Sequence, residues 1–356
     1  MSWLHSIAHR LAATLLAVTL AGLAPSPVAS EQATTGDPPK AVTDAVAAAL
    51  TPDDPAKIVL GAYINDIQEL DFKTNSYAID LYVWFRWKPG DFEPNKTMEF
   101  MNRYAPDDDV RADLYEKPKA MPDGSLYAIV RNQGRFSTKF QLEKYPFDTQ
   151  FLSVVMEDTI ADASKQVYVP DAEGGVTINP DITLPGFRVD KPLMRIVTKP
   201  YPTNFGDLSD PEATAYSRAT ISIPVTRPLV AMSIKTFVPI GLIVVCAALV
   251  FFVRPRYVEG RIGLGITALL TLVALQLTSG AALPDVDYLM MIDKVYLLAY
   301  VFIIVSLMHV VATSWWGADA NAEISISHGD RIWVAVLITA YIGANIAIAW
   351  SALRAG

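Results

Sequence analysis

Four long apolar stretches in the C-terminal part of the chain constrain the fold more than any other feature. They occupy residues 231–253, 262–283, 289–312 and 332–353. Each has about the length, ~20 residues, that a helix needs to cross a bilayer. The composition agrees, because 52% of the residues are hydrophobic and only 19% are charged, below the ~25% of soluble domains. The sequence therefore predicts a four-helix transmembrane domain over residues 228–356.

The N-terminus has the pattern of a secretory signal peptide. Arg10 precedes an apolar run at residues 11–24, which is too short to span a bilayer. Val28 and Ser30 are small residues at the −3 and −1 positions of a cleavage site. The sequence predicts a signal peptide over residues 1–30 and export of the segment that follows. An uncleaved anchor helix is the alternative.

Residues 31–227 are polar and follow a period of two. Short aromatic and β-branched runs occur at residues 77–87, 151–156, 166–169 and 219–225. Turn signals such as Pro122-Asp-Gly124 separate these runs, which is typical of a β-sandwich. The expected fold is an α+β membrane protein, with an extracellular or periplasmic β-sandwich before the four-helix transmembrane domain. Helical signal in the polar segment is confined to residues 41–50.

The charges that flank the apolar stretches predict the orientation. Arg254, Arg256 and Arg261 crowd the first connection, whereas Asp285 and Asp287 lie in the second. By the positive-inside rule the first connection is cytoplasmic. We therefore expect a multi-pass protein of the cell (inner) membrane with its β-domain exported.

Composition also excludes several functions. A net charge of −8 argues against a nucleic-acid partner. The single cysteine, Cys246, excludes an internal disulfide and a multi-cysteine zinc site. We expect no metal site, no cofactor and no catalysis, since the helices also lack the paired carboxylates and broken repeats of membrane enzymes and transporters. His309 lies at membrane depth, where it is a functional candidate or hydrogen-bonds a neighbouring helix.

Small and hydroxyl side chains form a stripe along the second apolar stretch. At 100° per residue, an arc of about 60° contains Thr267, Thr271, Ala274 and Thr278. The arc is extended by Gly263, Leu270, Leu277 and Ala281. Such a face contacts a neighbouring helix or lines a water-filled path with leucines as its constriction. Packing is favoured by periodicity alone.

Glu259 favours the second interpretation of this face, in which it lines a water-filled path. Repeated by symmetry at the cytoplasmic end of this stretch, it would form a ring that attracts cations. The alternative is a loop carboxylate paired with Arg256 or Arg261.

The segment Lys144-Tyr-Pro-Phe-Asp-Thr-Gln150 resembles the signature loop of the pentameric ligand-gated ion channels, or Cys-loop receptors. The two cysteines that bracket this loop in animal receptors would fall at Thr138 and Leu152, and their absence resembles the bacterial branch. Further similarities follow in the family's order at Trp87, Met98-Glu-Phe-Met-Asn102, Arg227 with Pro239, and Leu283-Pro284 with Tyr288 and Asp293. The resemblance runs from about Ile58 to the C-terminus.

The resemblance implies a homopentameric ion channel in the lipid bilayer, opened by a ligand. Placing Pro284 on the proline after the family's pore helix puts Leu270 at the central gate. The implied pore-lining residues are Glu259, Gly263, Thr267, Leu270, Ala274, Leu277 and Ala281. Glu259 then falls at the intracellular ring, where an acidic residue implies permeation by monovalent cations. A membrane-anchored sensor of the same fold whose pore does not conduct is the alternative.

The family also implies a junction that couples the two domains. Its counterparts here are Tyr145, Pro146, Phe147, Asp148, Arg227, Pro284 and Tyr288. A buried Asp148 needs a partner, and an arginine–carboxylate pair with Arg227 is the natural one. The junction transmits ligand occupancy to the pore or merely holds the two domains together.

The implied ligand pocket lies between subunits and is lined by aromatics. Its counterparts are Tyr82, Trp84, Glu157, Asp158, Thr159, Tyr201, Phe205 and Tyr216. Aromatics beside carboxylates suit an organic cation, and surface aromatics on an acidic face are the alternative. The tryptophan usual after the signature loop is replaced by Thr159. A proton or a divalent cation sensed by acidic runs at 107–109 and 157–158 stays open as the ligand.

Overall fold

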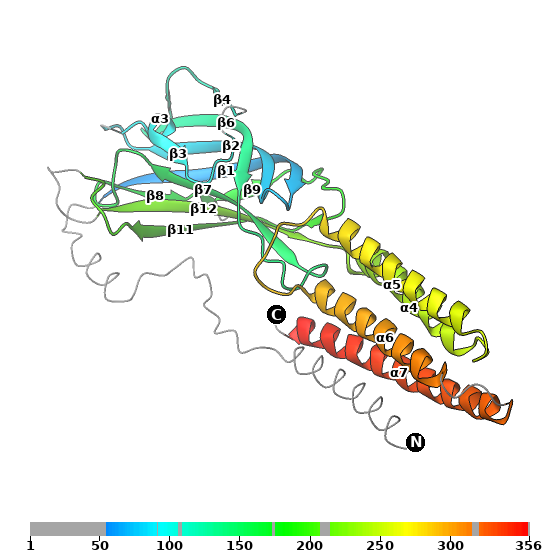
Figure 1. Cartoon of the computed structure of the whole chain (residues 1–356). Helices are drawn as coiled ribbons and strands as arrows, with labels where there is room; N and C mark the ends of the chain where they lie inside the picture. Colours follow the sequence, from blue (N-terminus) through cyan, green and yellow to red (C-terminus); the bar gives the residue numbers. More distant parts are fainter. Residues whose placement is uncertain are drawn as a thin grey trace. The chain divides into compact units, whose positions relative to one another are not determined.

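The computed structural model describes residues 55–90, 92–105, 109–172, 175–206, 214–314 and 320–354. The expected signal peptide and the expected helix at 41–50 lie outside the described residues. The described chain forms two compact units (Figure 1). The strand unit consists of two segments of the chain. The first runs up to Phe140, just before the signature loop, and the second is Thr149–Arg227. The helical unit comprises Gln141–Asp148 and the chain from Pro228 onward.

The strand unit contains two sheets among its described residues. In the seven-stranded sheet the order is β4-β6-β2-β1-β8, with β5 beside β6 and β9 beside β1. Its strands are β1 (Ala56–Asp71), β2 (Ser76–Trp87), β4 (Val110–Asp113), β5 (Lys119–Ala120), β6 (Leu126–Ser137), β8 (Gln166–Pro170) and β9 (Val176–Ile178). In the five-stranded sheet the order is β10-β12-β7-β3, with β11 beside β12. Its strands are β3 (Met98–Phe100), β7 (Thr149–Asp158), β10 (Arg188–Val189), β11 (Leu193–Pro200) and β12 (Ala215–Thr226), and the short helix α3 (Pro94–Thr97) precedes β3.

The period of two in the sequence creates the core of this unit. In β2, Leu81, Val83 and Phe85 are fully buried, whereas Asp80 and Tyr82 face outward. Strands β7 and β12 show the same alternation. Since each sheet has one apolar face, the two faces pack together and the polar faces meet water. The expected β-sandwich is confirmed.

The described residues of the helical unit form four long apolar helices. They are α4 (Leu229–Ala248), which continues into the 3₁₀ turn η3 (Leu249–Phe251), α5 (Val258–Gly280), α6 (Met291–Ser314) and α7 (Ala320–Arg354). Each contains a segment long and apolar enough to cross a membrane. The expected four-helix transmembrane fold is therefore confirmed.

The ends of two helices differ from the sequence expectation. Helix α5 begins at Val258 rather than at residue 262, and α7 begins at Ala320 rather than at residue 332. Most of the extra residues are polar, charged or glycine, so hydropathy did not mark them as part of a span. Glu259 consequently lies in the first turn of α5, where the helix dipole favours a carboxylate.

Candidate pore and ligand site

One face of α5 is exposed on the subunit, and it is the face expected to line a pore. Leu270 and Leu277 are 64% and 71% exposed. The other members of this face are also exposed, namely Glu259, Gly263, Thr267, Ala274 and Ala281. Their spacing follows the helical repeat, so they form one continuous strip, which we call the pore face.

The opposite side of α5 packs inside the subunit. Its buried residues are Arg261, Gly265, Ala268 and Leu272. Each lies two positions from a member of the pore face, or about 200° around the helix. A Cβ added to Gly265 would lie 2.4 Å from Leu307 Cδ2 on α6, so glycine permits the close approach of these two helices. The subunit therefore fixes the rotation of α5 about its own axis.

The hydroxyl groups of α5 are bonded to their own helix. Thr267, Thr271 and Thr278 each donate to the carbonyl oxygen four residues earlier, at 2.8 Å. Because each hydroxyl proton is engaged, the lone pairs of these oxygens remain available to other groups. The exposed hydroxyls are thus acceptors in this structure.

His309 of α6 contacts a neighbouring helix. Its Nε2 lies 2.7 Å from Oδ1 of Asp330 on α7. Of the two alternatives for this intramembrane histidine, the structure supports the interhelical hydrogen bond.

The signature loop is part of the helical unit and is tied to the connection after α5. The Leu142 backbone N–H donates to the Tyr288 hydroxyl at 2.9 Å. The Phe147 ring stacks on Phe237 of α4, with centroids 5.8 Å apart. The loop is therefore held both by a helix and by the segment that joins α5 to α6.

The other expected coupling residues of this unit lie in the same two segments. Tyr145 and Pro146 are joined by a cis peptide bond, and Asp148 is 3% exposed. Pro284 lies in the connection between α5 and α6. Every expected coupling residue except Arg227 therefore belongs to the helical unit, and Arg227 closes the strand unit.

Arg227 lies between two aromatic rings. Its guanidinium carbon is 4.5 Å from the centroid of Phe72 and 4.6 Å from that of Phe187. Cation–π contacts of this kind stabilise a guanidinium that is withdrawn from water. The pairing of Arg227 with Asp148 stays a prediction.

A charged cluster lies on the outer face of the five-stranded sheet, where β7 and β12 run side by side. Arg218 Nε donates to Glu157 Oε1, and Arg218 Nη2 donates to the Tyr201 hydroxyl at 2.8 Å. That hydroxyl in turn donates to Glu157 Oε2 at 2.8 Å. The side chain of Glu157 is only 4% exposed, against 24% for Arg218. We call these three residues the Glu157 cluster.

Aromatic rings gather beside the Glu157 cluster. The Tyr201 ring centroid lies 5.4 Å from that of Phe205 and 5.9 Å from that of Tyr216. Glu99 of β3 stands directly opposite Glu157 across the antiparallel ladder. The site therefore holds two carboxylates, one guanidinium and three rings.

Asp158 and Thr159 do not join this cluster. The Asp158 carboxylate accepts hydrogen bonds from the backbone N–H groups of Ile160 and Ala161 at 2.9 and 2.7 Å, and from the Thr97 hydroxyl. Thr159 Oγ1 donates to the Thr97 carbonyl oxygen at 2.9 Å. Both side chains hold the loop after β7 in place.

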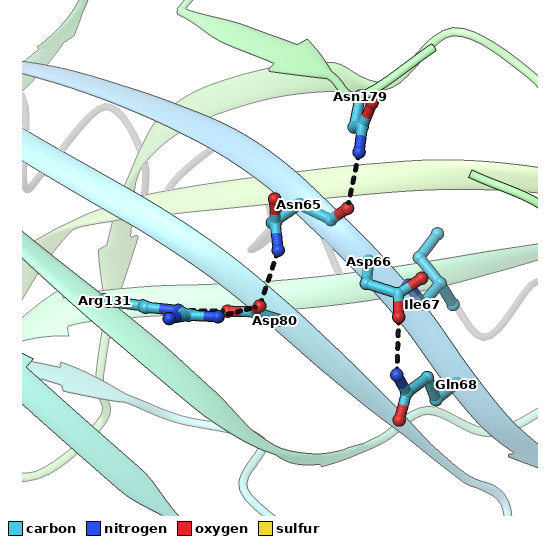
Figure 2. Close-up of polar contacts among 7 residues, drawn as sticks. All are labelled: Asn65, Asp66, Ile67, Gln68, Asp80, Arg131 and Asn179. Atoms are coloured by element: carbon cyan, nitrogen blue, oxygen red, sulfur yellow. Dashed lines mark hydrogen bonds and ion pairs between the residues drawn. The ribbon is translucent and has the colours of Figure 1, made fainter. Parts of the chain in front are cut away.

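Tyr82 belongs to a second cluster, on the outer face of the seven-stranded sheet. Arg131 donates to Asp80 from Nε and Nη2, at 3.0 and 2.7 Å, and Asn65 Nδ2 donates to the same carboxylate at 2.7 Å (Figure 2). The Arg131 guanidinium carbon lies 5.4 Å from the Tyr82 ring centroid. Asn179 donates to the backbone oxygen of Asn65 at 3.2 Å. The expected ligand residues of one chain thus divide between two sheets.

Trp84 lies near Tyr82 on the same face of β2. Its indole Nε1 donates to Asp171 Oδ2 at 2.8 Å, and Arg86 Nη2 lies 2.9 Å from Asp171 Oδ1. The ring covers Gly61, where a Cβ would lie 2.2 Å from the indole. Trp84 is therefore a packed side chain whose polar atom is engaged.

We expect the stability of the strand unit to fall in acid, in part because Asp80 becomes protonated. Burial by itself raises the pKa of Asp80, but hydrogen bonds from Arg131 and Asn65 outweigh burial and lower it. Since the folded-state pKa lies below the unfolded value of about 3.9, Asp80 stabilises the fold above that pH. This contribution is lost as the pH falls through the lower folded value. We expect Asp80→Asn to lower the thermal midpoint by a few degrees at neutral pH. On acidification, the thermal midpoint of Asp80→Asn should fall less than that of the wild type.

The measurement is thermal unfolding of the detergent-solubilised protein between pH 7 and pH 3. Asp181→Asn, at an exposed position, is the control and should follow the wild-type curve. Parallel curves for the wild type and Asp80→Asn would contradict the assignment.

The sequence analysis missed the residues that hold these clusters together. Arg218 lies two residues beyond Tyr216, and Asp80 two residues before Tyr82. Because side chains two apart share a face of a strand, the same period that revealed the strands points to both. Arg131 could not be predicted in this way, because its position opposite Tyr82 depends on the register of β6 against β2.

Comparison with known proteins gives consistent matches. Residues 236–316 match the family described as the neurotransmitter-gated ion-channel transmembrane region. The chain is 25% identical to a gamma-aminobutyric acid receptor subunit beta of Lymnaea stagnalis over 67% of this chain and 45% of that one. It is 24% identical to pH-sensitive chloride channel 2 of Anopheles gambiae over 76% and 47% of the two chains. It is also 24% identical to a glutamate-gated chloride channel subunit beta of Haemonchus contortus over 59% and 47%.

These relatives are receptor and channel subunits, and the chain spans about half of their length. The family match covers α5, α6 and most of α4. The described part of the chain has the β-sandwich and the four apolar helices in the expected order. The chain is therefore similar, in sequence and in fold, to the pentameric ligand-gated ion channels, the Cys-loop receptors.

Proposed function

We propose that the chain is a subunit of a homopentameric, ligand-gated ion channel. The observation that carries the proposal is the pore face of α5. A strip of a membrane helix that carries the Glu259 carboxylate and the Thr267 hydroxyl is poorly suited to lipid, and closed rotational symmetry turns it towards a central path by placing five copies around an axis. Ligand binding to the strand unit then shifts the equilibrium towards an open state. The receptor and chloride-channel names of the relatives support this class of function.

The test is current through the chain expressed in oocytes or reconstituted in planar bilayers under a salt gradient. Organic amines, amino acids, divalent cations and pH are stepped in turn. A gated current supports the proposal. Silence from a correctly assembled, membrane-inserted protein contradicts it and favours a non-conducting sensor.

We further propose that the channel prefers cations, although two of the relatives carry chloride in their names. Glu259 is exposed at the first turn of α5, in the strip that continues to Leu270. Arg261, the nearest positive charge on the helix, is 1% exposed. The threonine hydroxyls of α5 also offer acceptor oxygens, which suit a cation. A ring of carboxylates at a pore mouth attracts cations and repels anions.

Removing the charge of Glu259 should reduce this preference. We expect Glu259→Gln to lower the cation-to-anion permeability ratio several-fold, because five carboxylates disappear from the pore mouth together. Glu259→Asp retains the charge and is the matched control. The reversal potential under a salt gradient measures the effect. A wild type that reverses at the anion potential, or a Glu259→Gln channel that reverses with the wild type, would overturn the assignment.

We propose a small organic molecule with an ammonium group as the ligand. Glu157, Glu99 and the rings of Tyr201, Phe205 and Tyr216 offer negative charge beside aromatic faces, which together bind organic cations. Arg218 already engages Glu157, so the ammonium must compete with it. A ligand that also carries a carboxylate would compensate Arg218 at the same time, and two relatives are named for such amino acids.

The ligand proposal predicts the effect of Glu157→Gln. We expect the concentration of amine ligand needed for half-maximal current to rise at least about tenfold, because a charged hydrogen bond is worth about 1.5–3 kcal/mol. Glu116→Gln, at an exposed turn, is the control. An unchanged concentration dependence in Glu157→Gln would contradict the site.

Proton sensing by the sandwich carboxylates is the weaker alternative. Every aspartate of the described strand unit with a clear pKa shift is lowered rather than raised: Asp71, Asp80, Asp123, Asp162 and Asp171. Burial raises the pKa of Asp80, Asp162 and Asp171, but hydrogen bonds from neighbouring side chains and backbone N–H groups outweigh it, and such bonds lower the pKa of all five carboxyls. These groups remain ionised in mild acid, so they do not form a switch near neutral pH.

A further inference from the structure

An ion pair is buried inside the helical unit near the end of α5 that carries Glu259. Arg261 Nη2 lies 2.7 Å from Oδ2 of Asp330 on α7, and both side chains are 1% exposed. Arg261 Nε also donates to the carbonyl oxygen of Val250, in η3, at 3.0 Å. His309 of α6 binds the second oxygen of Asp330. Four segments of the subunit therefore meet around one carboxylate.

The surroundings of this pair keep water away. The His309 ring lies 5.5 Å from the ring of Phe251 and 5.3 Å from that of Trp333, measured between centroids. An arginine cannot lose its proton in a protein, and an unpaired buried charge is strongly destabilising. Arg261 therefore stays in the interior because Asp330 compensates its charge there.

The location of Arg261 matters because Glu259 is only two residues away. Released from Asp330, the long guanidinium side chain would move towards water at the mouth of the proposed pore. There its positive charge would oppose the carboxylate of Glu259, and symmetry would repeat the effect five times.

We propose that Asp330 is a specificity-determining residue of the channel. As a positioning residue on α7, it holds the Arg261 charge inside the subunit and neutralises it, so that Glu259 sets the charge of the first turn of the pore face. The inference rests on the proposed function, and it assigns to a helix outside the pore a role in ion selection.

The test compares the permeability ratio of variants under a salt gradient. Asp330→Asn leaves Arg261 charged and uncompensated, and we expect the cation-to-anion permeability ratio to fall several-fold. Arg261→Met should keep the wild-type ratio, because it removes a charge that the wild type already holds away from Glu259, and the His309 contact with Asp330 remains. A wild-type ratio in Asp330→Asn, or a raised ratio in Arg261→Met, would overturn the proposal.

A double variant covers the case in which Asp330→Asn does not fold. Arg261→Met with Asp330→Asn removes both charges, and replacing a whole buried pair is often tolerated. We expect this variant to have the wild-type permeability ratio and a higher thermal midpoint than Asp330→Asn alone. A shifted ratio, or effects of the two changes on the midpoint that simply add, would refute the pairing.

Arg331→Gln is the matched control, because Arg331 is the exposed neighbour of Asp330 on the same helix. It should leave the ratio unchanged. Failure of the proposed function looks different, since it is the absence of current from the wild type. If the wild type passes chloride, the cation proposal fails, yet Asp330→Asn must still move the ratio towards anions.

Discussion

Replacing Leu270 with serine is expected to open the channel in the absence of ligand and to lower the ligand concentration needed for activation. Leu270 is 64% exposed at the middle of the pore face. In a symmetric assembly five such leucines would form a constriction that closes by excluding water. Transfer of one leucine side chain out of water is worth about 1.5–3 kcal/mol, and the substitution acts five times. A shift of at least about tenfold in the open-to-closed equilibrium follows, because 1.4 kcal/mol already corresponds to tenfold.

The measurement is the ligand-independent leak current together with the concentration for half-maximal activation. Leu269→Ser is the matched control, since it makes the same change one position along α5, about 100° away from the pore face. Leak and activation equal to wild type in Leu270→Ser would show that another residue forms the gate. Equal effects of both substitutions would show that serine loosens the helix without reporting on a pore.

Most of the architecture was predictable because it depends on local periodicity. The runs at residues 77–87 and 219–225 became β2 and β12, since alternating apolar residues leave a strand only one face to bury. The four apolar stretches became four helices because in a bilayer the backbone must satisfy its own hydrogen bonds. The strip on α5 was named from helical spacing together with the resemblance, and its role as a pore lining stays a proposal.

The contacts that set the electrostatics of the site were not predictable in this way. Arg261 and Asp330 are 69 positions apart, and Glu157 and Arg218 are 61 apart. Each pair depends on which helices or strands become neighbours, which no local pattern records. One alternative from the sequence made Glu259 a loop carboxylate paired with Arg256 or Arg261, whereas the structure extends α5 to Val258 and turns Glu259 and Arg261 to different sides of the helix.

The start of α5 shows why helix ends are harder to predict than helices. Hydropathy falls at residues 258–261, so the expected span began at Ile262. Yet a pore helix has to pass from lipid-like surroundings to the charged mouth of a channel, and polar residues at its first turn are compatible with helical structure. In the proposed channel, the polar residues that lower the hydropathy of this turn are the ones that lie at the mouth of the pore.

Replacing Gly265 with valine is expected to destabilise the helical unit by about 1–3 kcal/mol, the usual cost of overpacking. A Cβ at this position would lie 2.4 Å from Leu307 Cδ2 and 2.8 Å from its Cγ, so α5 and α6 would have to separate or Leu307 would have to move. Gly263→Val makes the same change on the opposite side of α5, where nothing lies within 4 Å of the added Cβ. The thermal midpoint of the purified protein should therefore fall in Gly265→Val and stay close to wild type in Gly263→Val.

A second substitution makes the argument specific to one contact. Leu307→Ala removes the atoms that the new side chain would meet, so the double variant with Gly265→Val should recover much of the lost stability. Strong non-additivity of this kind is the signature of two side chains that compete for one space. Additive effects would mean that Gly265 is required for another reason, and the rotation of α5 that directs Leu270 outward would then need a different explanation.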